Sequence, residues 1–222
     1  NAIIGPLAPG PLDEVAVQAS AKNIPVIAPI SSDSELSHSN VFFSVPRDVV
    51  LRDKMLSYIE EIHKDENIII IADSTHQVAH DSILSKFPSA QIAKVIDNKS
   101  LHLDEFLIQL SEEKENWVFL ETEQPNMVAS VTSILNSANT AIISDEEVPE
   151  VKVRMFTTSY NAAFENEAVS KTHLSNLKFI FSSFYRESGN ADFINAYGKK
   201  YNGLIPDRSE ERRVGKECPL LC

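Results

Sequence analysis

The stretch NAIIGPLAPGPLDEVAVQASAKNIPVIAPISS, residues 1–32, has the sequence pattern of a complete βαβ unit. A first apolar run, residues 2–4, ends at a Gly-Pro pair, and a helix is predicted after it with Pro11 in the first turn and two acidic residues near its positive end. A second apolar run covers residues 24–28. Two short apolar runs flanking one helix within about 30 residues are typical of two parallel strands joined by a right-handed crossover. Because such a unit lies inside a sheet, we expect the chain to begin within a domain.

The alternation of strands and helices continues along the rest of the chain. The apolar run 68–72 is uninterrupted, which is typical of a strand covered on both faces, whereas 177–181 alternates as in a half-buried strand. Apolar runs predict strands at 41–46, 68–72, 92–96, 117–120, 153–157 and 177–181, and helical spacing predicts helices at 48–64, 77–87, 103–110, 125–135 and 190–202. This alternation predicts an α/β fold with parallel sheets.

The order of these elements predicts two lobes. We expect residues 1–44 to be part of a first lobe, residues 45–180 to form a complete second lobe, and residues 181–207 to return to the first. The second lobe should fold cooperatively because its strand and helix series is unbroken, whereas residues 1–44 and 186–207 should be loosely held.

Composition limits the possible partners. The 222 residues carry a formal net charge of −12, which disfavours binding to nucleic acid or anionic lipid. No apolar run approaches the roughly 18 residues that a membrane-spanning helix needs.

The last part of the chain differs in composition from the rest. Residues 208–222 are dense in charges of both signs and hold both cysteines, so a disulfide framework is excluded for the rest of the chain. The string SEERRVGKEC within this segment resembles one that recurs behind unrelated bacterial sequences. We interpret residues 208–222 as a non-native tail; the alternative is a native, disordered terminus.

Motifs for catalysis or cofactor binding are missing from the sequence. The glycines form no phosphate-binding turn, and no G-x-S-x-G stretch is present. The string HQVAH, residues 76–80, places Gln77 where a zinc protease needs a glutamate base, so we interpret His76 and His80 as exposed histidines on a solvated helix face. We expect no enzyme activity, no metal and no cofactor.

Three carboxylates follow predicted strand ends. Asp73 is expected to cap the next helix with help from Ser74 or Thr75, although a catalytic role is the alternative. Glu121 and Glu123 have the spacing of an acid–base pair, but nothing places a substrate between them, and we interpret both as residues at the rim of the sheet.

Several segments resemble one protein family when they are taken in order. The strings AIIGPL, IPVIAPIS, VFFSVPRD and NIIIIADS, followed late in the chain by FINAYGKKYNGLIPD, resemble the type I periplasmic binding proteins, the group of the leucine/isoleucine/valine-binding protein of amino-acid transport. The strings NWVFLETEQPNMVASVTSILNS, VRMFTT and HLSNLKFIFSS are similar to a bacterial branch in which this fold follows peptidoglycan-binding LysM repeats. The resemblance implies the two-lobed fold of this family, truncated at both ends.

The resemblance also implies a location and a site. It implies a non-enzymatic domain of the periplasm or cell envelope that holds a small polar ligand, such as an amino acid, between two hinged lobes at the carboxyl ends of the strands. The alternative is a scaffold or regulatory module of cell-wall assembly with an envelope protein as partner, because lipoprotein activators of peptidoglycan synthases use a similar fold. The positions that match the ligand-binding loops are Ala8, Ser31, Ser32, Asp73, Ser74, Glu121, Thr122, Thr158 and Ser159.

Overall fold

A computed structural model describes residues 1–7, 10–29, 31–32, 38–97, 100–139, 151–183, 195–196 and 199–200. It divides into two compact units, Asn1–Lys54 and the chain from Met55 onward. Each unit is described by itself below. The predicted tail, residues 208–222, and most of the predicted return segment, residues 181–207, lie outside the described residues.

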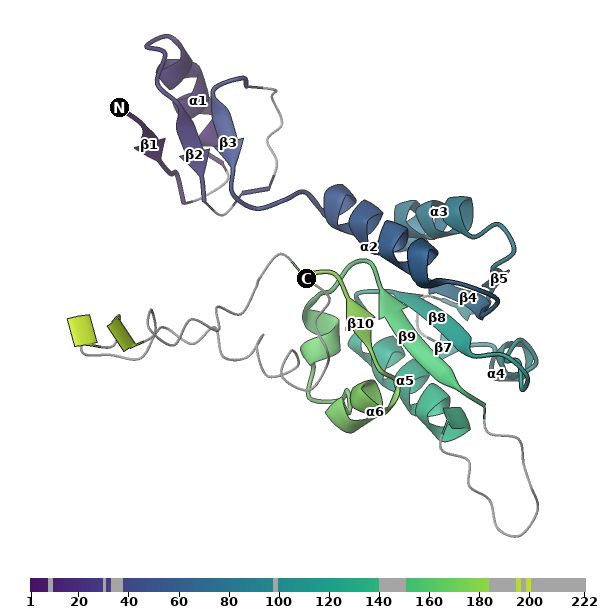
Figure 1. The fold of residues 1–222 in the computed structure, drawn as a ribbon. Helices are drawn as coiled ribbons and strands as arrows, with labels where there is room; N and C mark the ends of the chain where they lie inside the picture. Colours follow the sequence, from purple (N-terminus) through teal and green to yellow (C-terminus); the bar gives the residue numbers. More distant parts are fainter. Residues whose placement is uncertain are drawn as a thin grey trace. The chain divides into compact units, whose positions relative to one another are not determined.

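The first unit contains the βαβ arrangement that its sequence predicts. Its elements are β1 (Ile3–Ile4), α1 (Leu12–Ser20), β2 (Val26–Ala28) and β3 (Val41–Phe43). The strands form one parallel sheet in the order β1-β2-β3, and α1 packs against it (Figure 1). A small core of Leu12, Ala19, Val26 and Ala28 lies between helix and sheet. Gly5 has a φ of 130°, a left-handed conformation that explains why glycine directly follows β1.

An apolar row crosses the three strands of the first unit. Ile4 is in register with Ile27, and Ile27 is in register with Phe42. Ile4 is 76% exposed and Phe42 is 58% exposed, so none of the described residues buries either end of this row. A parallel sheet normally has both faces covered, and the first unit therefore buries little apolar surface for its size.

We predict that protease cleaves the first unit before the second. The first unit has a core cluster of four fully buried residues, whereas two much larger clusters hold the second unit together, so local opening costs less free energy in the first. Limited proteolysis followed by mass spectrometry should leave a resistant core close to residues 45–180. Leu12→Ala should accelerate cleavage within residues 1–44 without changing the resistance of that core. Uniform resistance from Asn1 onward would contradict the prediction.

The second unit is built on a five-stranded parallel sheet. Its strands are β4 (Asn67–Ala72), β5 (Gln91–Ile92), β8 (Asn116–Glu121), β9 (Val153–Thr157) and β10 (Ile180–Phe181). The strand order is β10-β9-β8-β4-β5, and every pairing in it is parallel. The predicted α/β class with parallel sheets is therefore confirmed.

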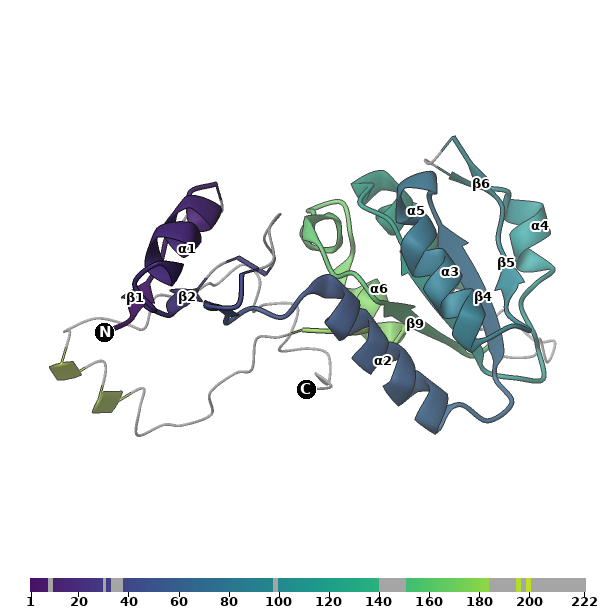
Figure 2. The ribbon, with the colours of Figure 1, turned by 90° about the horizontal axis from the view of Figure 1, so that it is seen from above.

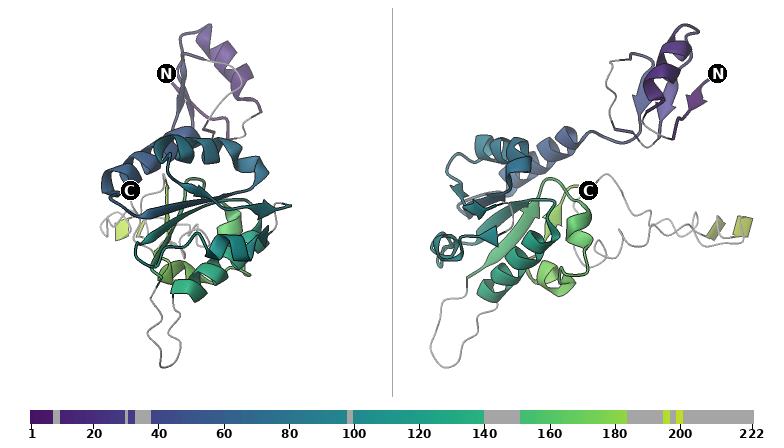
Figure 3. Two further views of the ribbon diagram at one scale, coloured as in Figure 1. Left: turned by 90° about the vertical axis from the view of Figure 1, so that its right-hand side faces the viewer. Right: turned by 180° about the vertical axis from the view of Figure 1, so that it is seen from behind.

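Helices cover both faces of this sheet, which Figure 3 shows edge-on. One face is covered by two helices, α3 (Gln77–Lys86) and the part of α2 (Asp48–Ile62) from Met55 onward. These helices pack against the side chains of Ile68 and Ile70, which β4 presents on that face. On the other face, α5 (Pro125–Asn139) and α6 (Lys171–Asn176) pack with Ile69 and Ile71. All four isoleucines of β4 are buried, which confirms that this strand is covered on both faces.

Two predicted strands differ from the structure. Residues 92–96 do not form one strand: β5 ends at Ile92, and β6 (Val95–Ile96) pairs antiparallel with β7 (Ser100–Leu101) in a separate two-stranded sheet. Of the predicted strand 177–181, only Ile180–Phe181 is extended, because Leu177 caps α6. Leu177, Phe179 and Phe181 are buried as the alternation predicts, but Ile180 is buried as well, because β10 packs against apolar side chains on both faces.

Three short helical segments were not predicted, and one predicted helix is shorter than expected. The segments are η1 (Ser74–His76), η2 (Ala162–Glu165) and α6, and the helix predicted at 103–110 is α4 (Leu103–Leu107). η1 follows the end of β4 and η2 follows the end of β9 after a short connection, so both lie near the carboxyl edge of the sheet.

Candidate functional site

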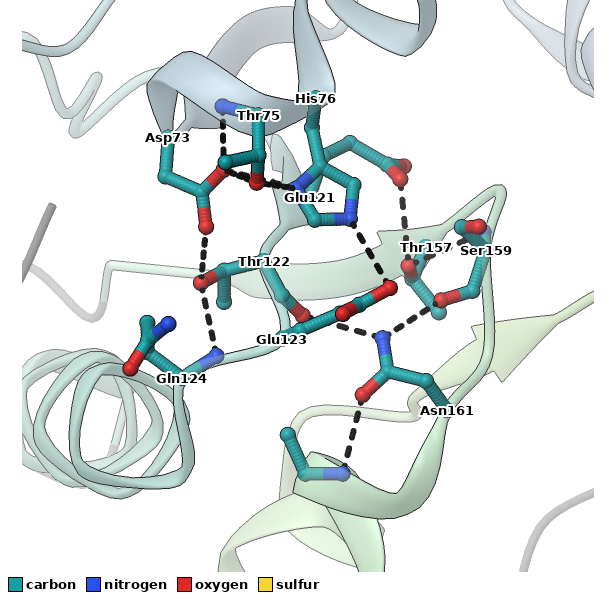
Figure 4. A network of polar contacts seen from close by, with 11 residues as sticks. Asp73, Thr75, His76, Glu121, Thr122, Glu123, Gln124, Thr157, Ser159 and Asn161 are labelled. Atoms are coloured by element: carbon teal, nitrogen blue, oxygen red, sulfur yellow. Dashed lines mark hydrogen bonds and ion pairs between the residues drawn. The ribbon is translucent and has the colours of Figure 1, made fainter.

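The carboxyl ends of β4, β8 and β9 meet at one edge of the second unit. Because the strands are parallel, Ala72 at the end of β4 is in register with Glu121 at the end of β8. The residues that follow form a polar cluster (Figure 4), which we call the carboxyl rim. The carboxyl rim consists of Asp73, Thr75, His76, Glu121, Thr122, Glu123, Thr157, Thr158, Ser159 and Asn161.

Asp73 is a buried hub of hydrogen bonds. Its Oδ1 accepts from the backbone N–H of Thr75 at 3.0 Å and lies 2.7 Å from Nδ1 of His76. Its Oδ2 accepts from the hydroxyl of Thr122 at 2.7 Å. Burial alone would raise the pKa of Asp73, but the hydrogen bonds of Thr75, His76 and Thr122 and the charge of His76 outweigh it and lower this pKa from 3.8 to about 2. Asp73 also caps η1, which confirms the capping role predicted for it.

His76 connects Asp73 to a second carboxylate. Its other ring nitrogen, Nε2, lies 3.9 Å from Oε1 of Glu123. The side chains of His76 and His80 are 11% and 15% exposed, so the expectation of two exposed histidines is wrong. Each histidine lies beside a carboxylate, His76 at 2.7 Å from Asp73 and His80 at 2.8 Å from Asp81.

Glu121 is fully buried, although its sequence position suggested a residue at the rim surface. Its Oε1 accepts from the backbone N–H of Thr158 at 2.6 Å, and its Oε2 lies 3.5 Å from the hydroxyl of Thr157. Glu121 therefore ties the end of β8 to the end of β9. Glu123, two residues on, has a side chain that is 71% exposed, so these two glutamates cannot act as an equivalent pair.

The hydroxyl of Thr158 has no hydrogen-bond partner in the described part of the chain, although it is buried. An unmet buried hydroxyl costs free energy, roughly 1–3 kcal/mol, so such a group marks a position where a ligand or an ordered water would be stabilised. Thr158 is one of the residues predicted to bind ligand.

Asn161 holds the far side of the carboxyl rim, and sequence analysis missed it. Its side-chain amide donates to the carbonyl oxygens of Thr122 and Ser159, both at 3.0 Å, and its Oδ1 accepts from the backbone N–H of Ala163. A capping signal was available, because Asn161 directly precedes η2 and asparagine is a preferred N-cap residue.

The predicted site residues divide between the two units. Asp73, Glu121, Thr122, Thr158 and Ser159 belong to one hydrogen-bonded network, and Ser74 is an exposed residue in η1 beside it. Ser31 and Ser32 lie in the first unit, shortly after β2, and both are partly buried. Ala8 lies outside the described residues.

The carboxyl rim is rich in acidic groups and hydroxyls. Within the ranges given above, no three His, Cys, Asp or Glu residues are placed to share a metal ion. No helix in the described part of the chain has the length and apolar character needed to cross a bilayer. The exposed carboxylate of Glu123 is able to accept hydrogen bonds from a cationic group, and the hydroxyl of Thr158 keeps an unused hydrogen-bonding capacity.

Comparisons with known proteins find similarity in structure. No family model matches the sequence, and no curated protein matches it. LpoA of Haemophilus influenzae superposes with a TM-score of 0.51 at 11% identity over 97% of this chain and 38% of that one. The C-domain of LpoA, a regulator of PBP1A, gives 0.48 at 11% identity, over 97% of this chain and 65% of that one. The isoleucine-bound substrate-binding protein LivJ of Streptococcus pneumoniae gives 0.40 at 16% identity over 91% and 58%.

These neighbours include a regulatory protein and a substrate-binding protein of an amino-acid transporter. The chain spans 38% of the length of LpoA. Two units with parallel sheets, the second covered by helices on both faces, agree with this similarity. The chain has an α/β fold similar to that of LpoA, with the two parallel-sheet units expected of the type I periplasmic-binding-protein-like fold.

Proposed function

We propose that this chain is a non-enzymatic, small-molecule-binding domain of a bacterial envelope protein. The observation that carries the proposal is the carboxyl rim, where the exposed Glu123 and the unmet hydroxyl of Thr158 stand on a buried framework of Asp73 and Glu121. In open α/β sheets, ligands bind beyond the carboxyl ends of the strands. Location in the periplasm or envelope is proposed from the fold alone.

The framework and the ligand contacts have separate roles in this proposal. Both oxygens of Asp73 already accept hydrogen bonds, and Glu121 holds Thr158, so these two carboxylates position their neighbours. Glu123 and Thr158 are left to contact the ligand. An exposed carboxylate beside further buried carboxylates favours a ligand with a cationic group, such as the ammonium group of an amino acid.

The geometry of His76 argues against catalysis by a hydroxyl nucleophile. In a triad, the hydroxyl and the carboxylate contact opposite ring nitrogens. Here the hydroxyl of Thr75 lies 3.0 Å from Nδ1 of His76, the same nitrogen that faces Asp73, and Nε2 faces Glu123. His76 therefore has no free nitrogen aligned to activate Thr75.

We expect Glu123→Gln to weaken the binding of an amino-acid probe by about 1.5–3 kcal/mol, because it removes the charge that faces the ammonium group. The measurement is titration calorimetry with L-isoleucine and L-lysine on the complete chain. The exposed Glu113, away from the carboxyl rim on the loop before β8, supplies the control Glu113→Gln, which should bind as wild type does. Ser31→Ala with Ser32→Ala tests whether these two residues, which were predicted to bind ligand, contribute to the affinity.

Two outcomes would contradict this assignment. The 2-hydroxy acid analogue of isoleucine lacks the ammonium group, so binding as tight as that of isoleucine would exclude Glu123 as the cation partner. If no amino acid produced binding heat in calorimetry or raised the melting temperature, the proposal that the chain binds an amino acid would be wrong.

The second candidate is a regulatory module of cell-wall assembly. Its support is the similarity of the fold to LpoA, whose C-domain is a regulator of PBP1A. In this case Asp73 and Glu121 only rigidify the sheet edge, and the envelope partner is a peptidoglycan synthase. A change in the rate of such a synthase on adding the chain, with no amino-acid binding, would favour this candidate. LysM repeats upstream of the chain in the intact protein would also favour the regulatory module.

A further inference from the structure

Four large apolar side chains on α4 and on the segments beside it are exposed at the surface of the second unit, and we call them the α4 patch. They are Ile92, Leu103, Leu107 and Ile108, and Ile108 is 85% exposed. Phe106 of the same helix is buried in the core and anchors α4 to the rest of the unit. Exposed apolar side chains are ordinary when they are scattered, but a cluster of them marks an interaction site.

Hydrogen bonds hold the segments of the α4 patch together. The side-chain amide of Gln109 donates to the carbonyl of Ile92 at 3.1 Å, which fixes the residues after α4 to the edge strand β5. The backbone N–H of His102 donates to the carbonyl of Lys94, which fixes the start of α4 to the same segment. Leu103 and Leu107 are four residues apart in α4 and therefore share one helix face. Figure 2 shows α4 and β5 side by side at this edge of the sheet.

A hollow of about 470 Å³ adjoins the α4 patch. Ile108 and Leu110 line it together with polar side chains that include Glu66, Gln91 and Lys114. The hollow lies at the amino end of β4, since Glu66 and Asn67 also line it, so it lies at the end of the sheet opposite the carboxyl rim. The α4 patch is therefore independent of the ligand site proposed above.

The charges around the α4 patch are mostly negative. Asp104 and Glu105 lie within α4, and Glu112 and Glu113 follow it; all four are exposed. Among the described residues, the basic groups nearby include Lys94 and His102, which lie 3.9 Å and 3.6 Å from Glu105, and Lys114 at the hollow. From this apolar centre with an acidic border, we propose that the α4 patch docks a protein segment whose apolar side chains are flanked by lysine or arginine.

The test uses the complete chain and a fluorescent synthetic amphipathic helix of leucine and lysine. We expect this peptide to bind, and the same peptide with glutamate in place of lysine to bind at least about tenfold more weakly. Leu107→Ser with Ile108→Ser, or Ile108→Ser alone, should weaken binding about tenfold without changing the net charge. Val78→Ser is the matched control, because Val78 is 69% exposed on α3, and it should leave binding unchanged. Glu112→Lys with Glu113→Lys should also weaken binding.

Each contrary outcome overturns the proposal. Equal binding by wild type and by the Ile108→Ser variant would show that the peptide is attracted only by the net charge of −12. Equal binding of the glutamate peptide would exclude a basic partner. A dimer seen in sedimentation that Leu107→Ser with Ile108→Ser abolishes would assign the α4 patch to a second copy of the chain.

Discussion

Replacing Phe119 by alanine is expected to lower the free energy of unfolding of the second unit by about 3–5 kcal/mol. Phe119 is fully buried in β8, a strand with neighbours on both sides. Its ring stacks on that of Phe156 at 5.3 Å and lies 6.1 Å from that of Phe87, so truncation leaves a cavity between two helices and the sheet. The neighbouring strands β4 and β9 limit how far the cavity can collapse.

The chain supplies its own probe for this measurement. Trp117, its single tryptophan, is buried in the same cluster, so its fluorescence during urea unfolding reports on the second unit. Val78→Ala on the surface of α3 is the control and should change stability by no more than about 0.5 kcal/mol. A loss below about 1 kcal/mol for Phe119→Ala would mean that this cluster does not carry the stability of the unit.

The fold could be predicted where the apolar pattern of a segment is long enough to identify a strand by itself. The strands β4 and β8 are continuous apolar runs, and such runs are typical of parallel strands that are buried on both faces. The prediction failed at residues 92–96, where an apolar run crosses from the edge of one sheet into another. Short edge strands are defined by their partners, and the partner of β6 is a segment that the sequence pattern did not single out.

The candidate site could be predicted only in outline. Asp73, Thr122 and Thr158 were singled out because side chains after parallel strands converge, and the three do lie in one network, whereas their ligand-binding role stays a prediction. Nothing in the sequence showed that Glu121 would be buried, because the groups that hold it lie 36 and 37 residues later in the chain. Burial and hydrogen bonding of a carboxylate are properties of the packed sheet edge, and local sequence does not contain them.

The second large effect concerns Asp73 and pH. Its pKa is about 2 in the folded chain against an ordinary value of 3.8. Because the folded pKa is the lower one, the unfolded state binds the proton first, and acid favours unfolding. The ionised Asp73 therefore contributes about 2 kcal/mol of stability above pH 4, and this contribution is lost as the pH falls from about 4 to about 2.

We expect Asp73→Asn to lower the free energy of unfolding near neutral pH by about 2 kcal/mol and to flatten its decline between pH 4 and 2. Thr122→Val should act in the same direction, because it removes the hydrogen bond to Oδ2 and lets the pKa of Asp73 rise toward its ordinary value. The measurement is urea unfolding at a series of pH values, with the exposed Asp53→Asn in α2 as the control that should follow the wild-type curve. If wild type and Asp73→Asn gave parallel curves down to about pH 2, the hydrogen-bonded Asp73 would not hold the carboxyl rim together, and the framework role assigned to it would fail.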